Sequence, residues 1–190
     1  QGQQAWNKEL EKIEVKTSNP EEAINFYTAM YHAFLSPTVY MDANNEYKGL
    51  DQKTHTANGF TNYTTFSLWD TYRTLHPLFN IIQPKRNNDM VKSMLAHFDQ
   101  SPLPMLPVWS NSANDTWCMS GYHSVSVVAD AIIKGNFTGD VNKALAACVT
   151  TSNQRNYEGI DDYIDKGYVP SDKNRTAVSN TLEYAYDDWC

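Results

Sequence analysis

Trp69, Asp70 and Arg73 place an aromatic ring, an acid and a base within one turn of a predicted helix. Asp70 and Arg73 stand at positions i and i+3, and the simplest interpretation is an exposed ion pair worth about 0.2–0.5 kcal/mol. The alternative is a pocket wall, where the carboxylate and guanidinium bind ligand hydroxyl groups and the indole stacks on the ligand ring. The apolar face of this helix is predicted to carry Leu68, Tyr72, Leu75, Phe79 and Ile82.

Glu183, Asp187 and Asp188 form an acidic cluster on the last predicted helix. Glu183 and Asp187 lie one turn apart, where like charges repel, and carboxylates near a helix C-terminus oppose the helix dipole. A helix that breaks both rules mildly indicates a functional site. A solvated acidic face is the structural alternative.

Asp115 and His123 are further candidates near the middle of the chain. Asp115 lies in a polar loop between Trp109 and Trp117, where an acid either faces a cleft or caps the following helix. His123 has no second histidine at the spacing of known zinc motifs, which argues against a zinc site. Trp69 and Trp117 are the candidate stacking platforms.

The composition is that of a globular domain. The chain has 190 residues, of which 41% are hydrophobic and 19% are charged, and this suffices for one domain with a core. A net charge of -7 without a basic stripe argues against nucleic acid as a partner. No apolar run is long enough to span a bilayer. The 3 cysteines are an odd number, so we expect small buried hydrophobes rather than a disulfide framework.

The elements that must position these side chains are mainly helices. Periodicity, caps and prolines predict helices at 19–35, 60–82, 85–99, 118–134, 140–151 and from 176 onward, and residues 8–15 form a short amphipathic segment. Asn19 and Asp140 are the predicted N-caps of the helices that they begin. Residues 38–58 are predicted as a short β-hairpin or an irregular excursion, and three prolines in 101–107 force an extended crossing. The helix at 19–35 is apolar on both faces, which predicts cover by two layers.

The last predicted helix has an apolar face and no stop signal before Cys190, so we expect the chain to be cut inside this element. The residues on this apolar face are Val178, Leu182, Ala185 and Trp189.

Six segments, taken together, resemble glycoside hydrolase family 92 in order and spacing. They are 26–32, 59–77, 106–109, 121–125, 167–170 and 181–189. The family comprises calcium-dependent, inverting exo-α-mannosidases, common in glycan-degrading Bacteroidetes. Its fold is a β-sandwich followed by an (α/α)6 barrel. The resemblance implies that residues 1–190 are a single partial domain from the first half of the barrel, without the β-sandwich and the C-terminal half.

The resemblance also implies a function. We expect part of an α-mannosidase, of the α-1,2 type, that acts on mannose-containing glycans with Ca²⁺ held by ligands outside this chain. The expected location is the periplasm, the outer membrane or the exterior of a bacterium. The expected substrate-binding residues are Trp69, Asp70, Arg73, Asp115, Trp117, His123, Asp187 and Asp188.

The catalytic motifs of the family are not in this sequence. Its general acid lies in Glu-Gly-Asn and its base in Asp-x-Asp followed by Gly and Met, and both are expected downstream of Cys190. The family often has Asn-Glu-Thr where this chain has Asn114-Asp115-Thr116. We therefore expect the isolated chain to be inactive, and marginally stable or self-associating because a half barrel leaves its inner face uncovered. The alternative is a non-catalytic helical module that binds carbohydrate or another partner.

Overall fold

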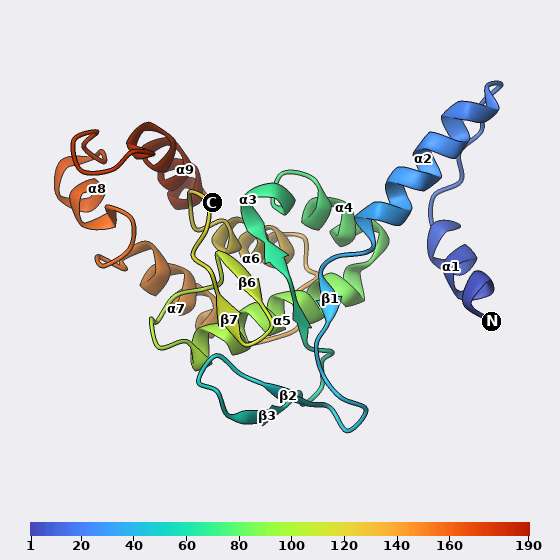
Figure 1. The fold of residues 1–190 in the computed structure, drawn as a ribbon, viewed down its shortest axis with the longest axis horizontal. Helices are drawn as coiled ribbons and strands as arrows, with labels where there is room; N and C mark the ends of the chain where they lie inside the picture. The colour runs from blue at the N-terminus through green and yellow to red at the C-terminus, as the bar shows by residue number, and fades with distance from the viewer.

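The computed structural model describes all of residues 1–190 as a mainly helical fold with short strands, which confirms the predicted fold class (Figure 1). None of the helices combines the length and apolar composition needed to cross a membrane. The helices are α1 (Gly2–Leu10), α2 (Pro20–Ala33), α3 (Leu68–Thr71), α4 (Leu75–Ile82), α5 (Pro84–Gln100), α6 (Ser124–Ile133), α7 (Val141–Ser152), α8 (Ile160–Lys166) and α9 (Ala177–Trp189).

Helix α5 is the centre of the body, with α4, α6 and α7 packed around it (Figure 1). It turns Met90, Met94 and Leu95 inward, as its periodicity predicts. These side chains belong to one core of 24 buried residues that continues through α6 and α7 to Tyr184 of α9. The extended crossing of residues 101–107 adds Met105 to this core.

Three small antiparallel sheets connect the helices. Strand β1 (Thr38–Val39) pairs with β4 (Tyr63–Thr64), and β2 (Glu46–Lys48) forms a hairpin with β3 (Thr54–Thr56), as predicted for 38–58. The third sheet has the order β5 (Phe66–Ser67), β6 (Trp109–Asn111) and β7 (Asn114–Asp115). Because β5 runs directly into α3, this sheet brings the start of α3 close to the loop that follows β7.

The predicted helix at 60–82 is wrong over its first part. Residues 63–67 form β4 and β5, since Thr and aromatic side chains favour strands, and Thr65 has a φ of 65°. Helix α3 then lasts a single turn, and α4 begins at Leu75. Pro77 accounts for this break, because proline has no N–H for the helix ladder and is accommodated only in the first turn of a helix.

The predicted helix at 118–134 begins late. Its helical part is α6, which starts at Ser124. Met119 and Gly121 precede it with φ values of 73° and 87°, in the left-handed region that a right-handed helix cannot include. The cysteine prediction is wrong for Cys118, which is exposed, and none of the cysteines is in a disulfide.

Helix α2 is correctly predicted as an element but not in its packing. Asn19 is its N-cap and accepts the Glu21 N–H, as predicted. Only Met30 of α2 is buried, so cover by two layers is wrong for this chain. Helices α1 and α2 project from the body (Figure 1), with Trp6 of α1 packed on Tyr31 of α2 at a ring distance of 4.6 Å.

Helix α9 is correctly predicted, but its apolar face points outward. Leu182 and Trp189 are 66% and 82% exposed. The buried face instead carries Asn180, Tyr184 and Asp187. Tyr184 stacks on Tyr122 at a ring distance of 5.1 Å, so aromatic stacking and polar contacts fix the orientation of this helix.

Candidate functional site

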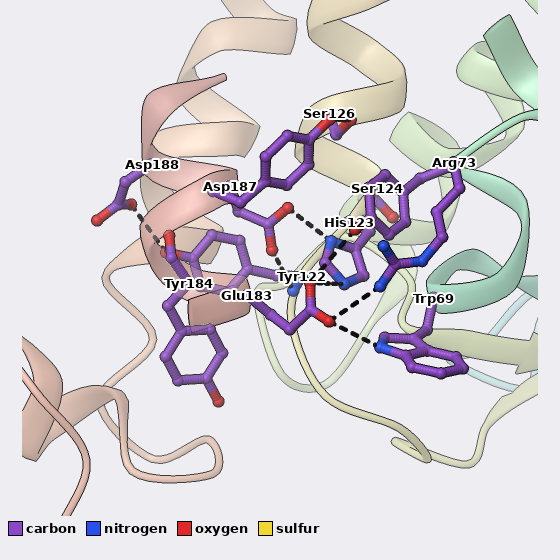
Figure 2. A network of polar contacts seen from close by, with 12 residues as sticks. Trp69, Arg73, Tyr122, His123, Ser124, Ser126, Glu183, Tyr184, Asp187 and Asp188 are labelled. Atoms are coloured by element: carbon purple, nitrogen blue, oxygen red, sulfur yellow. Dashed lines mark hydrogen bonds and ion pairs between the residues drawn. The ribbon is translucent and has the colours of Figure 1, made fainter. Parts of the chain in front are cut away.

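The carboxylate of Glu183 is the centre of a polar network between α9, α3 and the segment before α6 (Figure 2). Its Oε1 accepts the indole N–H of Trp69 at 3.0 Å and Nη2 of Arg73 at 3.1 Å. Its Oε2 accepts the hydroxyl of Tyr72 at 3.3 Å. Three donors from one short segment therefore converge on a single acid 110 or more residues away in the sequence.

The donors are also packed against one another. The guanidinium carbon of Arg73 lies 5.3 Å from the ring centroid of Trp69 and 4.8 Å from that of Tyr72, within cation–π range. Burial and the charge of Glu183 raise the pKa of Tyr72 to about 12. Its hydroxyl therefore keeps its proton and donates at neutral pH.

His123 lies behind Glu183, between that acid and Asp187 (Figure 2). Its Nδ1 is 2.8 Å from Oδ1 of Asp187, and its Nε2 is 3.4 Å from Oε2 of Glu183. The ring of Tyr72 stacks on the imidazole at 4.0 Å with an interplanar angle of 18°. Oδ2 of Asp187 accepts the backbone N–H of Tyr122 at 2.7 Å. Burial raises the pKa of Asp187, and its hydrogen bond with His123 acts in the opposite direction.

A pocket of about 340 Å³ opens beside Glu183. Both predicted stacking residues, Trp69 and Trp117, line it, and so do Asn180 and Glu158. Three of the lining residues, Trp117, Met119 and Glu158, have φ values of 56°, 73° and 35°. Such left-handed backbone at non-glycine residues is strained and clusters at functional sites. The pocket therefore joins aromatic walls, two carboxylates and strained loops, and it suits a ligand with hydroxyl groups and an apolar ring face.

The predicted pairing of Asp70 with Arg73 is wrong. Asp70 is exposed, accepts a hydrogen bond from the Ser67 hydroxyl, and is absent from the lining of the pocket. Helix α3 ends before Arg73, so the i,i+3 relation is lost and Arg73 turns to Glu183 instead. A direct contact of Asp70 with a ligand stays a prediction.

Asp115 does not open on the cleft, which corrects the expectation. Its side chain is 0% exposed. Its oxygens accept the backbone N–H groups of Val108 at 3.0 Å, Trp109 at 3.1 Å and Trp117 at 2.8 Å. Since α6 starts nine residues later, Asp115 is no helix cap either. Its role in the structure is to fix the loop that presents Trp117.

Asp187 and Asp188 do not line the pocket beside Glu183, which corrects a further expectation. Asp187 is 1% exposed and turned toward His123. Asp188 accepts the hydroxyl of Tyr122 at 2.8 Å, and both acids border an apolar pocket between α6, α7 and α9.

Glu183 is the residue that sequence reasoning left out of the predicted site. The sequence carried one signal for it, the like-charged pair with Asp187 on a single face. The donors that neutralise this pair lie more than 60 residues away, so their approach is not visible in local patterns. No three His, Cys, Asp or Glu side chains of the chain gather as a metal site.

Comparisons with known proteins agree on one family. The model described as the glycosyl hydrolase family 92 catalytic domain matches residues 1–190. A solved family GH92 α-mannosidase from Bacteroides thetaiotaomicron is 50% identical with a TM-score of 0.92, and the match covers 97% of this chain and 25% of that one. The same mannosidase has also been solved with mannoimidazole.

A second solved relative is a family GH92 inverting mannosidase from the same organism. It is 32% identical with a TM-score of 0.87, and the match covers 99% of this chain and 26% of that one. The chain thus spans about a quarter of the length of the solved structures it matches. The comparison with curated proteins gives no match.

Proposed function

Since the chain belongs to glycosyl hydrolase family 92, we propose that it is the part of an α-mannosidase that binds the terminal mannose of a glycan. Solved relatives are mannosidases, and one has been solved with mannoimidazole. The full protein in this proposal also contains a β-sandwich domain and the remainder of an (α/α)6 barrel. Its location is the bacterial periplasm, outer membrane or exterior.

The observation that carries the proposal is the hydrogen bond between Trp69 and Glu183, both of which line one pocket. A sugar presents C–H groups on its ring faces and hydroxyl groups around its rim. Trp69 and Trp117 offer aromatic faces for the C–H groups. Glu183 has lone pairs left to accept a hydroxyl, since a carboxylate has about four acceptor positions.

The proposed reaction is hydrolysis of an α-mannosidic bond with inversion, of the α-1,2 type. An inverting glycosidase needs an acid and a base about 6.5–9.5 Å apart, with a water between them. The acid and base motifs of the family are not in this sequence, so we assign the proton transfers to residues outside it. This chain's residues bind and orient the sugar, and the isolated chain is inactive.

Calcium is part of the proposal only because the family that the sequence resembles is calcium-dependent. It would bind sugar hydroxyls through oxygen ligands. No three acidic, histidine or cysteine side chains of this chain gather as a metal site, and in this proposal the calcium ligands lie outside the chain.

Mannose release by the full protein tests the proposal. The substrates are α-1,2-mannobiose and, as a control, an α-glucoside disaccharide, with the anomer of the first product followed by NMR. We expect release of β-mannose from the mannobiose alone. A protein that binds the mannobiose without cleaving it would support the non-catalytic module instead, and one that does neither would reject both.

A further inference from the structure

Nε2 of His123 is a buried polar atom without a hydrogen-bond partner. The side chain is 1% exposed, and Tyr72 covers one face of its ring. Gly121 closes the remaining side, because a Cβ built on it would lie 2.4 Å from Nε2. Oε2 of the Glu183 carboxylate lies 3.4 Å from this nitrogen.

The charged groups around the imidazole determine which of its two ring nitrogens carry a proton. Asp187 faces Nδ1 and Glu183 faces Nε2, while Tyr72 and Tyr186 present their rings. A bare Nε2 would point its lone pair at a carboxylate, which is repulsive in a buried place. A proton on Nε2 makes the same contact attractive, because an N–H then faces the carboxylate.

We propose that His123 is a positioning residue that holds Glu183 through a proton on Nε2. Asp187 fixes the imidazole, the imidazole fixes the carboxylate, and the carboxylate fixes Trp69 and Arg73 at the pocket wall. The connected order of contacts is visible in Figure 2. The importance of this arrangement for sugar binding rests on the proposed function, but the arrangement itself does not.

The proton on Nε2 can be measured directly in the unmodified chain. Long-range ¹H–¹⁵N spectra report the protonation of each histidine ring nitrogen and need no ligand. We expect a protonated Nε2 for His123, assigned with a His123→Asn variant. A bare Nε2 at neutral pH would overturn the proposal, whether or not any variant folds.

Two substitutions separate positioning from core filling. An asparagine places its amide where Nδ1 lies, facing Asp187, whereas a glutamine reaches the position of Nε2, facing Glu183. Both lose the stacking with Tyr72 equally. If His123 positions Glu183, His123→Gln retains the site better than His123→Asn. If His123 serves only to hold Asp187, the order reverses.

The readout is the indole N–H resonance of Trp69, assigned by Trp69→Phe. In His123→Asn we expect this resonance to move upfield because its acceptor is released, and in His123→Gln we expect it near its original position. Ser126→Ala is the control, since Ser126 contacts Tyr186 but neither carboxylate. Equal shifts in the two His123 variants, no shift in either, or a larger shift in the glutamine variant would each overturn the proposal.

The affinity of the full protein for mannoimidazole tests whether the positioning of Glu183 by His123 matters for ligand binding. We expect His123→Asn to weaken binding by roughly tenfold or more, the loss of one hydrogen bond to a charged group, with His123→Gln closer to wild type. If mannoimidazole does not bind at all while the Trp69 resonance behaves as expected, the proposed function fails and the positioning role stands. If mannoimidazole binds equally to all variants, the positioning of Glu183 by His123 does not contribute to ligand binding, and that part of the proposal is rejected.

Discussion

Glu183 and Asp70 differ in how much of the site depends on each. Glu183 accepts three hydrogen bonds beside the pocket, whereas Asp70 is exposed and bonds to Ser67. We predict that Glu183→Ala lowers kcat/KM of the full protein for α-mannosides by roughly ten- to hundredfold. Asp70→Ala should have the smaller effect. Steady-state kinetics check both variants, and a larger loss for Asp70 would move the binding site to the exposed side of α3.

Two buried histidines lower the free energy of unfolding of the chain as the pH becomes acidic. Burial lowers the pKa of His76 to about 4 and that of His97 to about 3. Unfolded histidine binds its proton near pH 6.5, so the unfolded chain takes up more protons, and stability falls as pH decreases from 6.5 toward these values. Each histidine contributes about 1.4 kcal/mol per pH unit.

Urea unfolding of the chain between pH 7 and pH 4 measures this slope. His97→Gln should remove about half of it, because the substituted side chain does not titrate. A stability independent of pH over this range would show that the two histidines take up their protons at the same pH in the folded chain as in the unfolded one.

The residue types of the site were predictable, but their partners were not. Trp69 and Trp117 were predicted as stacking residues and do line one pocket. Arg73 was predicted with Asp70, yet it pairs with Glu183, because the end of α3 decides which way it turns. Asp115 was predicted at the cleft, yet three backbone N–H groups take its oxygens. Local spacing therefore identifies candidates, and contacts distant in sequence assign their roles.

At the scale of elements, α9 separates a polar buried face from an apolar exposed one. We predict that Leu182→Lys changes the free energy of unfolding of the chain by about 0.5 kcal/mol or less, because Leu182 is 66% exposed. Tyr184→Ala on the opposite face should cost about 3–5 kcal/mol, since Tyr184 is fully buried. Chemical denaturation of both variants checks the orientation of the helix. The reverse order of effects would mean that Leu182 faces the core.

Helix boundaries were predictable where capping or proline chemistry marks them. Asn19 and Asp140 cap α2 and α7 as expected, each accepting backbone N–H groups of the first turn. The starts of α3 and α6 were missed, because strand pairing with a distant segment and left-handed residues override the helical periodicity. Which face of a helix is buried depends on the elements that pack against it. The exposure of the apolar face of α9 could therefore not be predicted from its own sequence.

At the scale of the whole molecule, the uncovered apolar surface predicts association. An apolar pocket of about 390 Å³ lies between α6, α7 and α9, and Ile133, Leu145 and Val149 beside it are exposed. Exposed apolar patches of this kind favour contact with other surfaces. We predict that the isolated chain forms oligomers as its concentration rises, or melts at a temperature that depends on concentration. Sedimentation velocity over a dilution series checks this, and a monomer with a constant melting temperature would contradict it.

We propose that the pocket beside Glu183 binds the terminal mannose. A crystal structure of the full protein with mannoimidazole tests it most directly. We expect the ligand ring in contact with Trp69 or Trp117, and a ring hydroxyl within hydrogen-bond distance of Glu183 or Arg73. A ligand bound elsewhere, with this pocket empty and the Glu183 network unchanged, would contradict it.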